Sequence, residues 1–190
     1  MNKFKKYFFF FIVFCFLGYI WEVFYTFYRK GVIINMGTLN GPWLPIYGSG
    51  GLLIYFIYKK IKTNTLSLFF ISSFMCAVIE YATSFYLEKV YGLSWWNYSH
   101  KPYNLNGRIY LEGILFFGLF SIICIKFFLP LLENLYDKLK GKTLSVIIYI
   151  LFGLFTFDFI YCTFNPNTSD AKKVSYNNVD FYKDEWYTLS

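Results

Sequence analysis

The chain has 190 residues and a formal net charge of +7; 57% of its residues are hydrophobic and only 15% are charged. Soluble domains carry about 25% charged residues, so this composition favours lipid as the main environment. The lysines lie in short gaps between apolar runs and form no basic face, which excludes nucleic acid as a partner.

Apolar runs long enough to cross a bilayer follow one another along the chain. The hydrocarbon core needs roughly 20 helical residues per crossing, and backbone groups in lipid must be paired within helices. We therefore predict an all-α polytopic membrane protein, a bundle of about five transmembrane helices. The expected single transmembrane domain spans residues 1–164, with helices at 7–28, 43–58, 66–87, 109–131 and 144–164, followed by a polar C-terminal tail at 165–190.

The second predicted helix is unusual because it ends early, at Lys59, Lys60 and Lys62. At 1.5 Å per residue its apolar part spans only about 24 Å, less than the thickness of the hydrocarbon core. We expect this helix to be short or partly re-entrant.

Lysines in short loops predict the orientation, because such loops stay on the cytoplasmic side. Lys3, Lys5 and Lys6 precede the first helix, and further lysines lie at 59–62 and 138–142. We expect a cytoplasmic N-terminus and, after five crossings, a tail on the outside. A composition rich in Lys, Asn, Ile, Tyr and Phe fits a bacterium with an AT-rich genome, so the expected location is the bacterial plasma membrane.

Four acidic residues fall inside predicted helices, namely Glu22, Glu80, Glu112 and Asp158. A carboxylate in the bilayer costs several kcal/mol unless it is paired, protonated or lines a polar cavity. On the expected topology all four lie about 5–10 Å below the outer boundary, which predicts an outward-facing polar cavity where the helices converge. The alternative is that each acid reaches the interface or bonds a neighbouring helix independently. Arg108 lies at the same edge and can neutralise some of these carboxylates.

A stretch rich in Gly and Pro, GTLNGPWLPIYGSGG at 37–51, leads into the second predicted helix. Proline suits the first turn of a helix, and glycine allows close helix contact. One interpretation is an unwound helix start that binds a ligand through free backbone groups; the other is tight packing, within the chain or in a homo-oligomer. The candidate residues are Asn35, Gly41, Pro42, Pro45, Tyr47, Gly48 and Gly50.

An aromatic and polar loop joins the third and fourth predicted helices, with WWNYS at 95–99 and NLNGR at 104–108. Trp and Tyr are enriched at membrane interfaces, so an interfacial belt is one interpretation. The other is a surface that binds carbohydrate or lipid headgroups, because hydrogen-bonding side chains stand beside stacking rings. The candidates are Trp95, Trp96, Asn97, Tyr98, Asn104 and Arg108.

Metal and triad chemistry have little support. His100 is the only histidine, and the four cysteines each lie in a different predicted helix without ligand-like spacing. We expect no metal site and no cofactor, and the sequence identifies no catalytic residue.

At these two loops the chain resembles the bacterial type IV ABC-transporter permease family, whose members are small integral membrane proteins. The resemblance rests on Gly18, on Glu22 and on segments 35–50 and 80–108, and it covers about residues 7–130. The family pattern commonly has Asp in place of Asn97 and Arg in place of Met36.

The resemblance implies substrate translocation with a separate ATPase subunit, since this chain has no nucleotide-binding motif of its own. Segment 133–142 is the internal segment long enough to form a short coupling helix. The expected function is thus a permease or transport-associated subunit with an acidic and aromatic cavity facing outward. The alternative is an outer-face membrane enzyme or binding protein acting on lipid-linked or envelope substrates, with two carboxylates as acid and base. A scaffold without a substrate is a third.

Overall fold

The computed structural model of the chain describes residues 3–60 and 64–173. Lys62, which entered the predicted orientation, and residues 174–190 of the tail lie outside the described residues. The helices are α1 (Lys3–Lys30), α2 (Pro45–Lys60), α3 (Thr65–Tyr91), α4 (Leu111–Ile123), α5 (Leu129–Leu139) and α6 (Lys142–Phe164), with a π-helical turn η1 (Cys124–Phe128) between α4 and α5.

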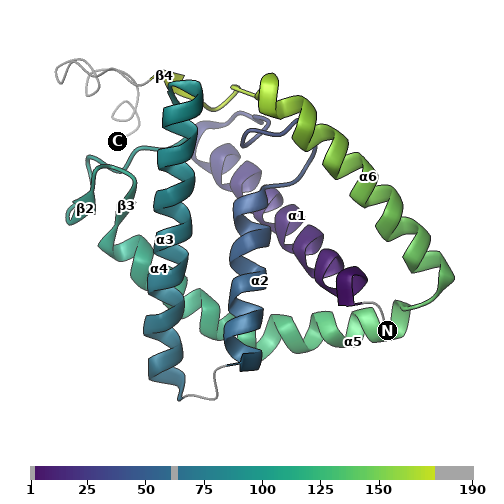
Figure 1. The fold of residues 1–190 in the computed structure, drawn as a ribbon. Coiled ribbons are helices and arrows are strands. Elements are labelled where there is room, and N and C mark those ends of the chain that lie inside the picture. The colour runs from purple at the N-terminus through teal and green to yellow at the C-terminus, as the bar shows by residue number, and fades with distance from the viewer. Residues whose placement is uncertain (1–2, 61–63, 174–190) are drawn as a thin grey trace.

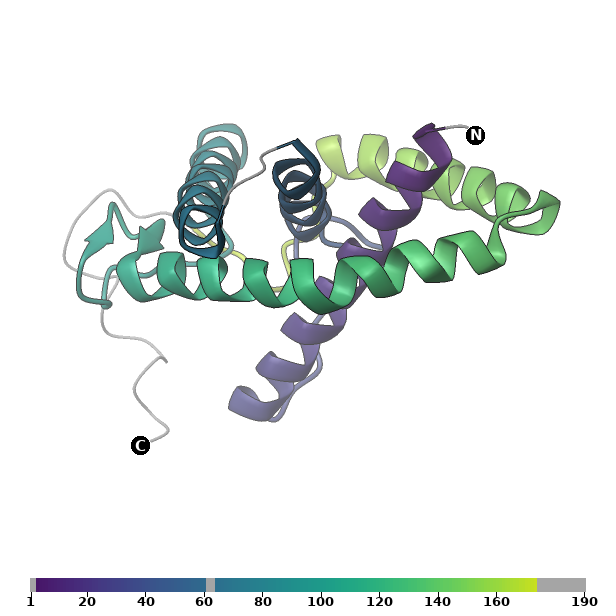
Figure 2. The ribbon, with the colours of Figure 1, turned by 90° about the horizontal axis from the view of Figure 1, so that it is seen from below.

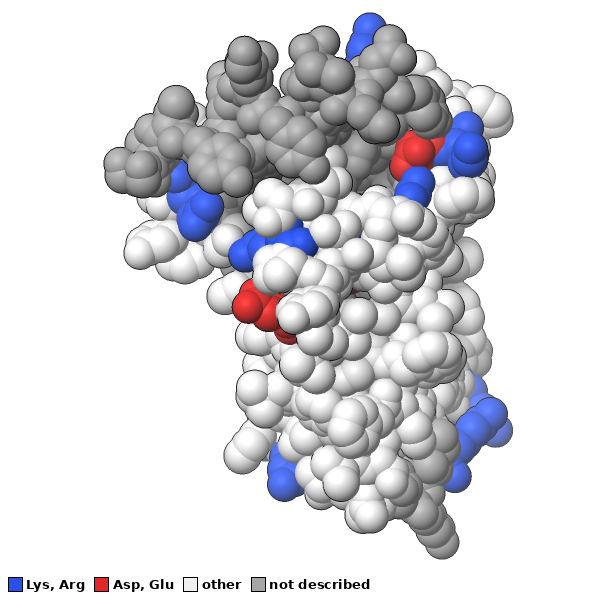
Figure 3. Space-filling model, turned by 90° about the vertical axis from the view of Figure 1, so that its left-hand side faces the viewer, with Lys and Arg blue, Asp and Glu red and all other residues white. Residues whose placement is uncertain are grey.

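The predicted all-α polytopic fold is confirmed. Four helices in the described part of the chain have the length and apolar composition to cross a membrane: α1, α3, the continuous rod 111–139, and α6. An uncharged band runs across the molecule between its charged ends (Figure 3), which is the surface that a lipid-embedded bundle presents. Helices α1 and α3 extend beyond their predicted spans at both ends, because backbone pairing continues past the last apolar residue, whereas α2 and α4 begin two residues later than predicted.

Helix α2 is short, as expected, with 16 residues. It starts beside α1, where the Leu44 N–H bonds the Cys15 carbonyl (3.1 Å), and ends where Lys59 meets Glu133 on α5 (3.1 Å). Helix α2 therefore begins beside the middle of α1 and ends beside α5 (Figure 1), so it is shorter than the bundle itself.

Segment 111–139 is one bent rod instead of a helix that ends at residue 131. In η1 the backbone hydrogen bonds span five residues instead of four, so that the Leu129 N–H bonds the Cys124 carbonyl. Pro130 follows and has no N–H to donate. This combination bends the rod, and α5 lies across the base of the bundle (Figures 1 and 2). Leu132 and Tyr136 of α5 face inward at helical spacing, while Asp137 and Lys138 are exposed.

The core gathers where α1, α2, η1 and α5 meet. Its largest members are aromatic: Phe10 is fully buried, and Tyr55 and Tyr136 pack against it edge-on. Two glycines bring α2 onto α1. A side chain at Gly48 would overlap Cys15, and one at Gly51 would overlap Phe14.

Short strands and loops make up the end of the bundle opposite α5. Strands β2 (Asn104–Leu105) and β3 (Ile109–Tyr110) form an antiparallel ladder, and β1 (Leu93–Ser94) pairs antiparallel with β4 (Lys172–Lys173). The first residues of the tail thus fold back onto the loop that follows α3.

The basic end comprises residues 3–6, 59–60 and 129–142, and the loop end comprises loops 31–44 and 92–110 with segment 165–173. The three basic segments from which orientation was predicted lie at one end, within the described residues. That this end faces the cytoplasm stays a prediction from its charge.

Candidate functional site

The loop between α1 and α2 is fastened to α6 by a single carboxylate. Asp158 Oδ2 accepts hydrogen bonds from the Gly41 N–H (2.9 Å) and from Trp43 Nε1 (2.8 Å). Its Oδ1 accepts a third from the Asn40 N–H (3.3 Å). Hydrogen bonds to an ionised acceptor are strong, so Asp158 fixes the turn that leads into α2.

The same loop is held from its other side by the start of the tail. Asn167 Nδ2 donates to the carbonyls of Asn35 (2.9 Å) and Gly37 (2.8 Å). Asp170 Oδ2 accepts from the Gly37 N–H (3.0 Å), and burial raises the pKa of this carboxyl to about 6. Gly37 adopts φ +79°, a left-handed conformation that favours glycine.

Tyr47 stands in the first turn of α2 and places its hydroxyl on the Glu22 carboxylate of α1, which accepts a hydrogen bond from it. Gly18 makes this possible, because a side chain at that position would overlap the Tyr47 ring. The glycine and the tyrosine of the two motifs therefore act together, and they position Glu22.

The asparagines of loop 92–110 serve the loop itself. Asn104 Nδ2 donates to the carbonyls of Lys101 (2.7 Å) and Ser99 (3.2 Å), while its Oδ1 accepts from the Gly107 N–H (3.0 Å). Asn97 Oδ1 accepts from the Ser99 N–H (2.8 Å). These polar groups, for which a binding surface was one of two interpretations, are largely used to hold the loop in shape.

The two tryptophans of this loop also pack within it. Trp96 Nε1 donates to the Arg108 carbonyl (3.1 Å), and the Trp95 ring meets Tyr91 edge-on at 6.0 Å between centroids. Neither ring is strongly exposed.

The folded loop holds Tyr98 in a defined position. Its ring packs against Tyr110 with centroids 4.6 Å apart, and its hydroxyl donates to Glu80 Oε1 (3.3 Å). Burial, followed by the nearby charges of Glu80 and Glu22, raises the pKa of the Tyr98 phenol. The phenol therefore stays protonated and acts as a donor.

We call Glu22, Tyr47, Glu80 and Tyr98 the acid–tyrosine cluster. It unites α1, α2, α3 and loop 92–110, and its charges interact: Glu80 with Glu22, and Tyr47 with both. Glu80 is only 8% exposed. Within the described residues the ion pairs of the structure involve other carboxylates, so both acids are held by neutral hydroxyls. Repulsion between them is relieved when one binds a proton or a cation.

Arg108 has a different partner from those expected. Its guanidinium forms an ion pair with Glu88, at the end of α3, and lies over the rings of Tyr81 (5.5 Å) and Phe85 (5.7 Å). Arg108 therefore anchors loop 92–110 to α3 and leaves the acid–tyrosine cluster uncompensated.

Of the four acids singled out in the sequence, the structure brings two together. Glu112 is exposed at the start of α4, and Asp158 serves the loop between α1 and α2. Depth along a helix fixes the height of a residue but not the face from which it projects. Asp170, whose charge interacts with that of Glu22, gave no signal because the charges of the tail nearly cancel.

Some of the remaining candidates at 35–51 make contacts within the protein, and others are exposed or meet no neighbour. Asn35 accepts from the Tyr19 hydroxyl (3.0 Å), and Pro45 begins α2. Pro42 is exposed, and a side chain at Gly50 would meet no atom within 4 Å, so close approach falls to Gly48 and Gly51. The described part of the chain contains no group of three or more His, Cys, Asp or Glu residues that could hold a metal ion.

Comparison with known proteins places most of the chain in one family. A family model described as "Putative ABC-transporter type IV" matches residues 9–163, a span that includes the acid–tyrosine cluster and α5. No curated protein and no solved structure gives a significant match.

Proposed function

Because the chain belongs to the type IV ABC-transporter family, we propose that it is a permease or transport-associated membrane subunit of the bacterial plasma membrane. In this proposal the acid–tyrosine cluster is the solute site, in a cavity that opens at the outward-facing loop end. Helix α5 is the contact for a separate ATPase subunit, because the chain itself carries no nucleotide-binding motif.

The observation that carries the proposal is the pair of acids without a cation. Glu22 and Glu80 interact electrostatically, and each is bonded by a tyrosine hydroxyl instead of a lysine or arginine. A cationic or protonated polar solute would supply the missing positive charge, and the hydroxyls of Tyr47 and Tyr98 would supply directional hydrogen bonds. Intramembrane carboxylates of this kind commonly mark substrate or ion pathways.

Helix α5 has the features of a coupling element. Glu133 ties it to Lys6 of α1 (3.0 Å) and Lys59 of α2 (3.1 Å), while Asp137 and Lys138 face away from the bundle. Helices α1 and α2 also carry Glu22 and Tyr47. A displacement of α5 by an ATPase would therefore be transmitted along the two helices that bear half of the cluster.

The solute site is tested by binding and uptake in variants of the cluster. Glu22→Gln and Glu80→Gln remove one charge each while keeping the shape of the side chain, and we expect each to abolish saturable uptake of cationic solutes. Glu112→Gln is the matched control, since Glu112 lies at the same end but is exposed outside the cluster. Uptake that survives both cluster variants would overturn the assignment of the site.

The ATPase contact is tested by copurification from the native membrane in mild detergent, with partners identified by mass spectrometry. We expect an ATPase at stoichiometric level with the wild type and its loss when Asp137 and Lys138 are both replaced by Ala. Lys126→Ala, which removes an exposed charge from η1, should leave the complex intact. Folded wild-type protein without an ATPase would contradict the subunit role.

One feature favours the alternative of an outer-face enzyme or binding protein. Each buried carboxyl is paired with a phenol, and such pairs can act as general acid and base on an envelope or lipid-linked substrate. The two functions predict different results for the same variants. For an enzyme, α5 variants would leave activity unchanged, and Glu80→Gln would abolish turnover while substrate binding persists.

A further inference from the structure

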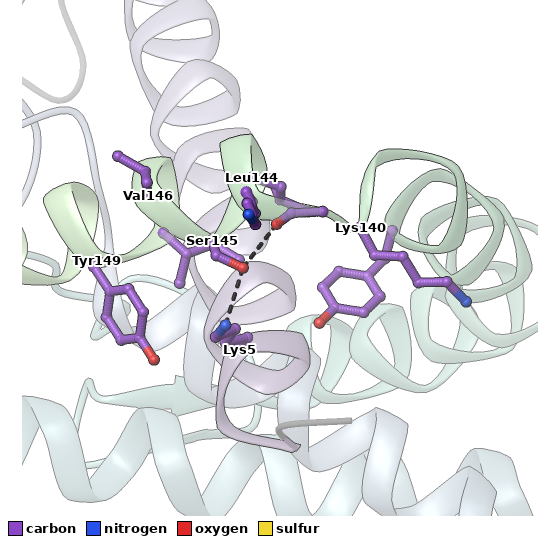
Figure 4. A pocket seen from close by; sticks show the side chains of 10 residues that line it. Lys5, Lys140, Leu144, Ser145, Val146 and Tyr149 are labelled. Atoms are coloured by element: carbon purple, nitrogen blue, oxygen red, sulfur yellow. Dashed lines mark hydrogen bonds between the residues drawn. The ribbon is translucent and has the colours of Figure 1, made fainter.

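A hollow at the basic end lies between α1, α5 and α6, far from the acid–tyrosine cluster. Its volume is about 640 Å³, and its lining includes three lysines, Lys5, Lys140 and Lys142, one from each of these helices or its end. Figure 4 shows Lys5, Ser145 and Tyr149 converging on the hollow, with Lys140 at its edge. Among the described residues, no Asp or Glu lines it.

Partners within the protein neutralise or bind only part of the positive charge that lines the hollow. Lys5 Nζ donates to Ser145 Oγ (2.9 Å) and lies 5.3 Å from the centre of the Tyr149 ring. Lys140 pairs with Asp137 (3.0 Å), where both side chains are about half exposed. Lys142 makes no ion pair within the described residues.

The start of α6 adds donors to these charges. The helix begins at Lys142 after Gly141, which offers no side-chain cap, so the first-turn N–H groups have no side-chain partner at this end. Such groups bind anions and oxyanions together with the helix dipole. Below them, Leu144, Val146 and Ile148 give the hollow an apolar wall.

We propose that this hollow binds a phosphate group, and we assign that group to the headgroup of an anionic phospholipid. A phosphate monoester or diester matches three lysines and free helix N–H groups, and the glycerol and upper acyl chains match the apolar wall. Basic pockets between transmembrane helices bind anionic headgroups in this way. The volume suits a ligand of headgroup size, since ligand pockets are about 300–1,000 Å³. Helix α6, whose surface is largely exposed along its length, leaves a lateral route from the bilayer.

The test uses the full chain in mild detergent, with phosphatidylglycerol or phosphatidylcholine of equal chain length added and the retained lipid measured by native mass spectrometry. We expect phosphatidylglycerol to be retained preferentially, and Lys142→Gln to weaken its binding ~5-fold, in line with the contribution of one lysine. Lys126→Gln is the matched control, because it removes the same charge from η1 outside the hollow.

Inorganic phosphate in millimolar excess separates the two sources of the ligand. If it displaces the lipid only weakly, the headgroup assignment holds; if it displaces the lipid fully, the phosphate chemistry holds and the ligand is a soluble phosphate. Equal retention of the two lipids, or unchanged binding in Lys142→Gln, overturns the proposal. Lys142 is chosen over Lys5 because Lys5 also links α1 to α6 through Ser145.

Discussion

Carboxylates near the two ends of the molecule are held in different ways. At the basic end, Glu133 is paired with two lysines, Lys6 at 3.0 Å and Lys59 at 3.1 Å. Toward the loop end, Glu22 of α1 and Glu80 of α3 are bonded by tyrosine hydroxyls. An ion pair cancels the charge of a carboxylate, whereas a neutral donor orients the carboxylate and leaves its charge. The comparison therefore points to the loop end for solute binding and to the basic end for attachment of helices and partners.

The two ends also differ in the bonds on which their stability depends. The ion pairs of the basic end are partly open to water, where such pairs contribute at most about 1 kcal/mol. The loop end depends on hydrogen bonds to backbone groups, on the largely buried ion pair between Arg108 and Glu88 and on close glycine contacts, whose loss costs more. Substitutions at the loop end should accordingly have the larger effects on unfolding.

The largest expected effect is that of Asp158→Ala. Three donors, the N–H groups of Asn40 and Gly41 and Nε1 of Trp43, would lose their acceptor, and we expect a loss of about 3 kcal/mol in the free energy of unfolding. The measurement is thermal or denaturant unfolding in detergent. Asp158→Asn keeps part of the acceptor and should show roughly half the effect. Wild-type stability in Asp158→Ala would refute the fastening role.

Gly18→Ala should come next, with a loss of about 2 kcal/mol, because the new methyl group would overlap the Tyr47 ring. The displaced Tyr47 would also release Glu22, so solute binding should fall in the same variant. Gly50→Ala is the control: its methyl group would meet nothing within 4 Å, and alanine has the higher helix propensity. Equal effects of the two substitutions would remove Gly18 from the account of the cluster.

The sequence predicted the helices well because a lipid-crossing helix needs a long apolar run, which is a strong local signal. It allowed a short helix at 133–142, but it did not predict the bend at η1 or that the fourth helix continues through η1 into α5. There the apolar run continues into α5, and the sign of a bend is a single proline, Pro130, whose effect depends on how the preceding turn adjusts.

The site was harder to predict, because it depends on which face of each helix meets a neighbour. Glu22 and Asp158 lie at similar depth, yet one faces Tyr47 and the other faces loop 31–44. Tyr47 and Tyr98 were both named as candidates, but their pairing with particular acids is a long-range property of the fold. The docking of Asn167 and Asp170 was missed entirely, since a polar segment with balanced charge has no periodic pattern.

Glu133→Gln tests the basic end and should cost less, about 0.5–1 kcal/mol, because its ion pairs are partly exposed. The loss of stability should be smaller at 1 M salt, where the Debye length is about 3 Å and the ion pairs are largely screened. Asp137→Asn breaks the more exposed pair with Lys140 and should change the unfolding free energy little. If Glu133→Gln destabilised the protein as much as Asp158→Ala, the distinction between the two ends would fail.

The smallest expected effect is a pH dependence confined to segment 165–173. Burial raises the pKa of Asp170 from its ordinary value of 3.8 to about 6, so the docked state favours the protonated acid. Its contribution to docking is therefore fully present below about pH 4 and is lost as the pH rises through 6. Hydrogen exchange at the Asn167 N–H, which donates to the Thr38 carbonyl at 2.9 Å, should report more frequent opening at pH 7.5 than at pH 5 after correction for intrinsic rates. Asp170→Asn should abolish that difference, while Glu133→Gln at the other end should preserve it. Tighter docking at pH 7.5 would show that the Gly37 N–H and nearby Lys30, which favour the charged form, outweigh burial.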